Sequence, residues 1–386
     1  MMQDSRSRDS FVLRAALFYA VSYSLLGIHL PFFPVWLQST GFSAGEVGAI
    51  LAATALLRIV SVPVATAAAD RKFGLRPTII LFATATAAGF SALGLVSGAW
   101  LIVALTAFTA FAHTPAVALQ DAYTLRGLRA RSAVYGPVRL WGSIFFILAN
   151  LGAGLAFDLI ETRHLIWLLA AAAMATALVA TLLLPLPAPV PVTEQGLPPR
   201  PFWRAGRFIA IVIAASLIQS SHAVYYGFST ITWKAAGFDG LVIGSLWALG
   251  VVAEIVLFAC VGRLPRAFGP VQLIVLGGLG AAIRWIGLAF DPTGWTLPLL
   301  QVLHALSFGA SHLGAVAFIA HAAPEGRGAT AQGYFSVAQG IAFSASMLLA
   351  GTLYAAIGAA SYAAMAAIAL AGAAVAGVVW LRKPDV

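Results

Sequence analysis

Long apolar stretches follow one another along most of the chain and constrain its fold more than any other feature. A transmembrane helix needs about 20 apolar residues, and such stretches can be marked between charged residues, prolines and glycines. The stretches are continuous rather than alternating, which argues against a β-barrel. We therefore predict an all-α membrane protein with twelve transmembrane helices at 13–37, 46–69, 77–98, 100–124, 133–157, 164–184, 208–233, 241–262, 271–290, 295–321, 329–357 and 360–381.

The composition supports this class and excludes several others. Only 9% of the 386 residues are charged, whereas a soluble domain carries about 25%. The single cysteine, Cys260, cannot form an internal disulfide, and no His/Cys spacing indicates a metal site. The apolar run after Arg14 is longer than a signal-peptide core, so we expect the first helix to be retained.

Basic residues predict the orientation of these helices. Most of the 22 Lys and Arg residues lie at one set of alternate segment ends, whereas Arg163 and Lys234 lie at the other. The positive-inside rule assigns the basic side to the cytoplasm. Both termini are then expected in the cytoplasm of a cell whose plasma (inner) membrane holds the protein. The net charge of +9 therefore reflects a membrane face, and no nucleic-acid partner is expected.

The segment 185–207 is rich in proline, which disfavours a continuous helix and favours an extended linker. It separates two sets of six predicted helices. We therefore expect an N-terminal six-helix bundle over 1–184, a cytoplasmic linker over 185–207 and a C-terminal six-helix bundle over 208–386.

The two predicted halves resemble one another near their second helices. Gly41-Phe42 is followed by Gly48 and Arg58, and Gly237-Phe238 is followed at the same offsets, 7 and 17, by Gly244 and Glu254. Related halves of six helices are typical of duplicated transporters, which bind substrate near the midplane between the repeats.

Several longer motifs carry a family resemblance over most of the chain. They are LPFFPVWLQSTG at 30–41, YGPVRLWGS at 135–143, SHAVYYGFSTITWKAAGF at 221–238, LWALGVVAEI at 246–255, IRWIGL at 283–288 and LQVLHALSFGASHLG at 300–314. The chain resembles the major facilitator superfamily, and more closely the phenylpropionate permease family, which is related to the lactose permease group. The resemblance implies two pseudo-symmetric six-helix bundles that work by alternating access, and proton-coupled uptake of a small aromatic carboxylate such as 3-phenylpropionate. A sugar or nucleoside substrate and an export direction remain alternatives, because related permeases differ in both.

The same resemblance implies a gating loop between the second and third helices. The superfamily pattern is Gly-x-x-x-Asp-basic-x-Gly-x-basic-basic, and the segment from Thr66 to Arg76 matches it at Asp70, Arg71, Gly74 and Arg76. Thr66 replaces the leading glycine, and one residue is inserted before Gly74. The counterpart in the second half, 262–269, contains no acidic residue.

Ionisable residues inside apolar segments are costly in a bilayer, by about 2.5–3.5 kcal/mol at the centre on insertion scales. Such residues are expected to face a cavity or a partner. The formal charges well inside the predicted helices are Arg58, Asp121, Arg139, Glu254 and Arg284. Three arginines against two acids favour an organic anion as substrate. Substrate binding is assigned to Arg58, Asp121, Arg139 and Arg284, with Tyr225 and Tyr226 as aromatic contacts.

Asp121 and Arg139 lie 18 residues apart on consecutive helices at similar depth. The resemblance implies that both bind substrate, whereas a structural ion pair between the two helices is the alternative. Arg139 is suited to a carboxylate because guanidinium binds it through two hydrogen bonds. Arg58 is expected at the midplane, where it binds an anion or is neutralised by Glu254.

Glu254, Arg284 and His304 match residues that the lactose permease group uses for substrate and proton coupling. The carboxylate that carries the proton in that group is replaced here by Ser307. We therefore assign proton coupling to Glu254 or His304, with Asp121 as a further possibility. His29, His113, His222 and His312 also lie in apolar segments, and His312 is best explained by a hydrogen bond between helices.

Other functions are less well supported. No nucleophile–base set, metal cluster or phosphate-binding Gly-rich loop stands out, so an enzyme and an ATP-driven pump are not expected. The cytoplasmic segments are too short for the output domain of a sensor. The expected partners are a small-molecule substrate, protons and the lipid bilayer; the protein is expected to be a monomer without cofactor.

Overall fold

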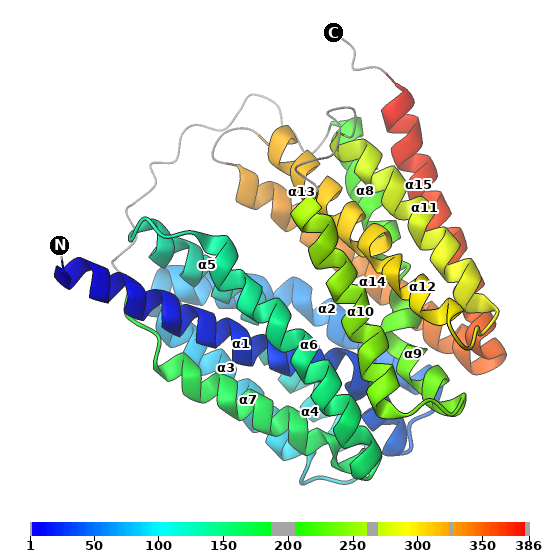
Figure 1. Ribbon diagram of the computed structural model, residues 1–386, viewed down its shortest axis with the longest axis horizontal. Coiled ribbons are helices and arrows are strands. Elements are labelled where there is room, and N and C mark those ends of the chain that lie inside the picture. Colours follow the sequence, from blue (N-terminus) through cyan, green and yellow to red (C-terminus); the bar gives the residue numbers. More distant parts are fainter. Residues whose placement is uncertain (1, 187–204, 261–268, 324–326, 383–386) are drawn as a thin grey trace. The chain divides into compact units, whose positions relative to one another are not determined.

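The computed structural model describes residues 2–186, 205–260, 269–323 and 327–382, and helices account for most of them (Figure 1). In chain order the helices are α1 (Met2–Ser39), α2 (Ala44–Ala68), the π-helix η1 (Ala69–Phe73), α3 (Leu75–Leu93), α4 (Ala99–His113), α5 (Ala116–Arg129), α6 (Tyr135–Leu159), η2 (Thr162–His164), α7 (Leu165–Thr181), α8 (Gly206–Ser220), α9 (Ala223–Ala235), α10 (Gly240–Cys260), α11 (Pro270–Ala289), α12 (Thr296–Val302), the π-helix η5 (Ala305–Ala310), α13 (Ser311–Ala322), α14 (Gly328–Ile357), η6 (Gly358–Ser361) and α15 (Tyr362–Leu381).

Within the described residues, 11 helical stretches are long and apolar enough to cross a membrane. The last of them, Thr330–Leu381, contains two of the segments predicted from the sequence. Gly358, with φ of 56°, turns the chain between α14 and α15, and Gly98, with φ of 111°, precedes α4. Short turns at these glycines separate neighbouring predicted segments, and the count of twelve crossings stays a prediction.

Three predicted segments are interrupted rather than single helices. The segment 100–124 divides into α4 and α5, because Pro115 has no backbone N–H to continue the helix. The segment 208–233 divides into α8 and α9, where the hydroxyls of Ser220 and Ser221 donate to carbonyls of the preceding turn. The segment 295–321 contains the π-helix η5, and π-helical turns are frequent at functional sites.

The chain divides into two compact units that differ slightly from the predicted bundles. Unit 1 comprises Met1–Phe42, Leu56–Val190 and Trp233–Ala248, and unit 2 comprises Ser43–Ala55, Pro191–Thr232 and Leu249–Val386. The proposed linker at 185–207 falls largely outside the described residues, as does most of the second-half loop 262–269. The division into bundles over 1–184 and 208–386 therefore stays a prediction.

Helix packing inside each unit follows the same scheme. In unit 1, α1 packs on α6 and α7, and α3 packs on α4 and α7. In unit 2, α8 packs on α14 and α15, and α11 packs on α13 and α15. Counted along the predicted segments, these are the same four pairs in each half. The recurrence supports the internal repeat inferred from the glycine spacing.

The repeated glycines allow helices to touch through their backbones. In unit 1, a Cβ on Gly154 would lie 2.2 Å from the carbonyl oxygen of Gly240, and one on Gly244 would lie 2.3 Å from that of Asn150. In unit 2, a Cβ on Gly48 would lie 2.5 Å from the Cα of Gly351. Gly48 and Gly244, the matched glycines of the repeat, therefore share a packing role.

A carboxylate reinforces the contact between α6 and α10. The two oxygens of Asp158 accept hydrogen bonds from the backbone N–H of Gly240, at 2.7 and 2.8 Å, and Lys234 Nζ lies 3.5 Å away. An acid at a helix N-terminus is favourable because the first N–H groups have no partner within the helix. Asp158 therefore caps α10 from a helix that is distant in sequence.

This contact predicts that Gly154→Ala destabilises the protein, because its methyl group overlaps the Gly240 carbonyl. Overpacking of this kind costs about 1–3 kcal/mol, and thermal denaturation of the purified protein in detergent measures it. Gly152→Ala is the matched control, since nothing lies within 4 Å of a Cβ there. Equal denaturation midpoints for the two variants would contradict the prediction.

Candidate functional site

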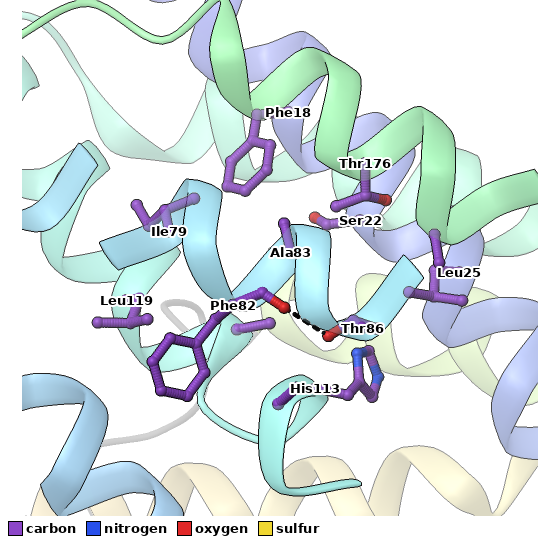
Figure 2. Close-up of a pocket in the computed structure, with 13 residues that line it drawn as sticks. Phe18, Ser22, Leu25, Ile79, Phe82, Ala83, Thr86, His113, Leu119 and Thr176 are labelled. Atoms are coloured by element: carbon purple, nitrogen blue, oxygen red, sulfur yellow. Dashed lines mark hydrogen bonds between the residues drawn. The ribbon is translucent and has the colours of Figure 1, made fainter. Parts of the chain in front are cut away.

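A small, mostly apolar cavity lies inside unit 1. It lies among α1, α3, α4, α5 and α7 and has a volume of about 30 Å³ (Figure 2), which is room for a single water molecule. Its wall is mostly apolar, with Ser22, Thr86, His113 and Thr176 as the polar members. Thr86 donates to the carbonyl of Phe82 at 2.8 Å. None of the predicted substrate residues lines this cavity.

Asp121, on α5, is bound by two tyrosines of unit 1. Its Oδ1 accepts hydrogen bonds from the hydroxyl of Tyr19 on α1 and, at 3.0 Å, from the hydroxyl of Tyr135 on α6. Tyr19 is fully buried, and its hydroxyl oxygen lies 3.2 Å from that of Tyr135. Phenol donors stabilise the carboxylate form. Through these hydrogen bonds with neutral hydroxyl groups, Asp121 connects α5 to α1 and α6.

Arg139, on α6, is not ion-paired with Asp121 in the part of the chain that the structure describes. Its guanidinium lies over the ring of Tyr23, 4.2 Å from the centroid, and 5.8 Å from that of Tyr19. Its Nη1 donates to Ser143 at 3.3 Å. Tyr19 thus contacts both predicted residues, and the cation keeps unused donors.

Arg58 lies in the middle of α2, where it is exposed. No described residue of unit 1 forms an ion pair or a hydrogen bond with it. Apolar residues exposed on either side of it, Leu56 and Val60, show that this part of α2 is open. A cation without a partner among the described residues of its own unit is consistent with the predicted anion-binding role, and the alternative of neutralisation by Glu254 stays open.

Arg284, on α11, is the centre of a polar cluster in unit 2. Its side chain is fully buried. Nη2 donates to Gln301 Oε1 at 2.7 Å, and Nη1 donates to His304 Nδ1 at 2.9 Å and to Ser307 Oγ at 3.2 Å. Among the described residues no carboxylate lies within ion-pair distance of it. The guanidinium is therefore held by neutral acceptors alone.

Aromatic rings cover the faces of this guanidinium. Its central carbon lies 4.3 Å from the ring centroid of Tyr225 and 4.8 Å from that of Trp285. Tyr225 also donates to Gln301 Oε1 at 3.0 Å, and Tyr226 stacks on His222 with centroids 5.6 Å apart. The cluster therefore brings together Arg284, His304 and both predicted tyrosines.

Two histidines are held in fixed tautomers by their neighbours. An arginine can only donate, so His304 Nδ1 must accept from Arg284, and the neutral ring carries its proton on Nε2. That Nε2 faces Glu254 Oε2, on α10, at 3.8 Å. His222 Nδ1 lies against the carbonyls of Ile218 and Gln219 and must donate, so its Nε2 accepts from Ser307 at 3.3 Å.

Three other predicted histidines lie against aromatic rings. His29 and His113 lie together in unit 1, with ring centroids 5.5 Å apart, and both contact Phe90. His312 stacks on Phe308 at 5.6 Å, and the hydrogen bond between helices expected for it stays a prediction.

The predicted gating residues Asp70 and Arg71 lie in η1, at the end of α2, and Gly74 and Arg76 lie at the start of α3. Gly74 has φ of 80°, in the left-handed region that favours glycine.

Comparison with known proteins explains this arrangement of ionisable residues in apolar helices. The model of the MFS_1 like family matches residues 12–364. The chain belongs to this family. A probable 3-phenylpropionic acid transporter from Escherichia coli (strain K12) is 31% identical over 92% of this chain and 94% of its own length. The maltose permease of Geobacillus stearothermophilus is 29% identical over 83% of this chain and 82% of its own.

Solved structures show the same fold. The crystal structure of the nucleoside transporter NupG superimposes with a TM-score of 0.83 at 16% identity, covering 97% of this chain and 100% of that one. As a member of the MFS_1 like family, the chain is an integral membrane protein of a major facilitator type. Its relatives are transporters rather than enzymes.

Sequence reasoning missed four members of the clusters in this MFS_1 like protein. Gln301, Tyr19, Tyr23 and Tyr135 carry no formal charge, so a census of charges inside apolar segments passes over them. Helical spacing could have found two of them, because Gln301 lies one turn before His304 and Tyr19 one turn before Tyr23.

Gln301→Leu is predicted to destabilise unit 2, because Arg284 Nη2 and the Tyr225 hydroxyl lose their common acceptor. A buried donor left unsatisfied costs about 1–3 kcal/mol, which thermal denaturation in detergent measures. Tyr225→Phe removes only one neutral donor from the same oxygen and should cost less. A Gln301→Leu protein as stable as the wild type would contradict this assignment.

Proposed function

We propose that this protein takes up a small aromatic carboxylate of the 3-phenylpropionate type together with a proton, by alternating access. In this proposal twelve helices form two six-helix bundles, the chain works as a monomer in the inner membrane, and both termini lie in the cytoplasm. The family assignment supports transport in general. The substrate class and the proton coupling rest on the side-chain clusters.

The fully buried guanidinium of Arg284 carries the proposal. An uncompensated charge inside a protein costs several kcal/mol, and here only neutral oxygens, a ring nitrogen and aromatic faces offset that cost. A carboxylate would supply the missing negative charge and two acceptors in the geometry that guanidinium prefers. Displacement of the Gln301 oxygen from Nη2 would make room for it.

The surroundings of Arg284 suit an aromatic acid. Tyr225, Trp285, Tyr226 and His222 give faces and edges on which a phenyl ring can pack. The first relative described above is named a probable 3-phenylpropionic acid transporter, which agrees with this chemistry.

Unit 1 supplies further anion-binding groups in this proposal. Arg139 lies over the ring of Tyr23 and makes one side-chain hydrogen bond, to Ser143, among the described residues of unit 1, and Arg58 lacks a partner among them. Asp121 would position Tyr19 and Tyr135 beside Arg139 rather than neutralise it. Stacking on Tyr23 fixes the plane of the Arg139 guanidinium, which a lysine could not reproduce.

Glu254 is the proposed proton carrier. A second proton on His304 would have to bind Nδ1, which already faces an N–H group of Arg284. A second proton on His222 would bind Nε2, which already accepts from Ser307. Protonation of the Glu254 carboxylate displaces neither of these two hydrogen bonds, and loss of its negative charge would release His304 and Arg284 toward the substrate. His304 then transmits the state of Glu254 to Arg284.

Glu254→Gln is predicted to abolish uphill uptake driven by a pH gradient while sparing exchange, because the glutamine stays permanently neutral. Proteoliposomes measure both activities. Unchanged gradient-driven uptake would remove Glu254 from this role.

Two histidine variants test the coupling role of His304. His304→Asn retains an acceptor near the Nδ1 position and should retain exchange better than His304→Gln, which places its amide near the Nε2 position. Equal loss in both variants would argue against an orienting contact with Arg284.

A neutral sugar or nucleoside is the second candidate substrate, because a maltose permease and a nucleoside transporter are among the similar proteins. Counterflow in proteoliposomes separates the candidates, since it needs neither a gradient nor a known direction.

Labelled 3-phenylpropionate should exchange, whereas its neutral amide should bind about tenfold or more weakly, as expected when a charged hydrogen-bond partner is lost. Arg139→Lys should weaken exchange of the acid. Exchange of maltose or a nucleoside without exchange of the acid would overturn the proposed substrate.

A further inference from the structure

A pocket lined by charged residues lies in unit 1, at the predicted gating loop. It has a volume of about 360 Å³ and is formed by η1, the start of α3, the last turn of α5 and the residues that follow α7. Four of the side chains that line it are cationic, and one is acidic: Arg71, Lys72, Arg76, Arg126 and Asp70. The excess of positive charge indicates an anionic ligand.

The start of α3 adds backbone donors to these cations. Gly74 precedes the helix without a side-chain cap, and nothing lies within 4 Å of a Cβ at that position. The first N–H groups of the helix therefore have no side-chain acceptor. Helix N-termini of this kind bind phosphate, because their amides and the helix dipole both favour negative charge.

Arg76 is a preorganised member of the pocket. Its Nη2 donates to the carbonyl of Thr181 at the end of α7, at 2.9 Å, and its Nε is buried without a hydrogen-bond partner among the described residues. The hydrogen bond to Thr181 fixes the position of the Arg76 guanidinium. An anion in the pocket would accept hydrogen bonds from its remaining N–H groups.

Unit 2 contains a pocket at the corresponding place of the repeat. It has a volume of about 560 Å³ and lies at the start of α11 and the ends of α13 and α15. Arg207, Arg382 and His321 line it, and α11 begins after Gly269, again without a side-chain cap. Both halves therefore place basic residues around the uncapped start of their third helix.

The neighbouring surface favours a lipid over a free phosphate ion. The pocket lies where apolar helices end, and Phe73 beside it is 55% exposed. Val60 and Val64, on the preceding turns of α2, are also exposed and precede Arg71 at helical spacing. An acyl chain could lie along this apolar strip while the head group occupies the pocket.

We propose that the pocket at η1 and α3 binds the phosphate group of an anionic membrane lipid, with Arg71, Lys72 and Arg76 as its principal contacts. The pocket in unit 2 is the repeat-related site for the same chemistry. Basic pockets at the cytoplasmic ends of transmembrane helices are known to suit such head groups. This assignment does not depend on which substrate the protein carries.

Native mass spectrometry of the purified full-length protein tests the proposal with phosphatidylglycerol as probe and phosphatidylcholine of the same acyl chains as comparison. Phosphatidylglycerol should bind more tightly. The double variant Arg71→Gln/Lys72→Gln should weaken it about tenfold or more at this site, because each cation near a lipid surface contributes about fivefold. Arg129→Gln is the control. Arg129 is an exposed cation at the end of α5 and does not line the pocket.

Several results would overturn the proposal. Equal affinity for the two lipids would mean that the pocket is not specific for an anionic lipid, because both carry a phosphate and they differ in net charge. Equal weakening by Arg129→Gln and the double variant would mean that the attraction does not come from this pocket. Displacement of phosphatidylglycerol by millimolar inorganic phosphate would assign the pocket to the free ion. Thermal denaturation shows whether each variant is folded, and Arg71 and Lys72 are exposed side chains.

Discussion

A guanidinium removed from water must be compensated by what surrounds it, and in unit 2 this constraint organises a whole cluster around Arg284. Gln301, His304 and Ser307 each direct an acceptor at it, and Tyr225 and Trp285 cover its faces. None of these partners is charged, so among the described residues the cluster gives the guanidinium neutral acceptors and no counter-charge, and Arg284 Nε has no hydrogen-bond partner there. That combination suits a site whose counterion arrives with the substrate.

Hydrogen-bond direction links this cluster to the proton. Arginine can only donate, and this single fact fixes the tautomer of His304 and the side of its ring that faces Glu254. Ser307, which replaces a carboxylate of the lactose permease group, accepts from Arg284 and donates to His222. A neutral relay therefore stands at that position, and in the proposed mechanism the ionisable role falls to Glu254.

The ionisable side chains inside the two units are surrounded by different groups. In unit 1, Asp121 is bound by phenol hydroxyls and Arg139 by the ring of Tyr23. The expected depths of these two residues were compatible with an ion pair, yet an aromatic layer contributed by α1 lies against both. Aromatic residues can satisfy an acid through their hydroxyls and a cation through their faces.

The sequence by itself determined the class of protein, because no soluble fold can cover so many apolar residues with so few charges. It also determined the repeat and the residues whose charge is too costly to leave in lipid: Arg58, Asp121, Arg139, Glu254 and Arg284. Family resemblance added His304 and the loop from Asp70 to Arg76. Only the tertiary structure decided the partners, since a hydrogen bond between Arg284 and Gln301 or between Asp121 and Tyr19 joins different helices and leaves no local signal. The helix breaks beside His113, His222 and His304 also depend on the tertiary structure. Packing against neighbouring helices compensates for the backbone hydrogen bonds that each break gives up.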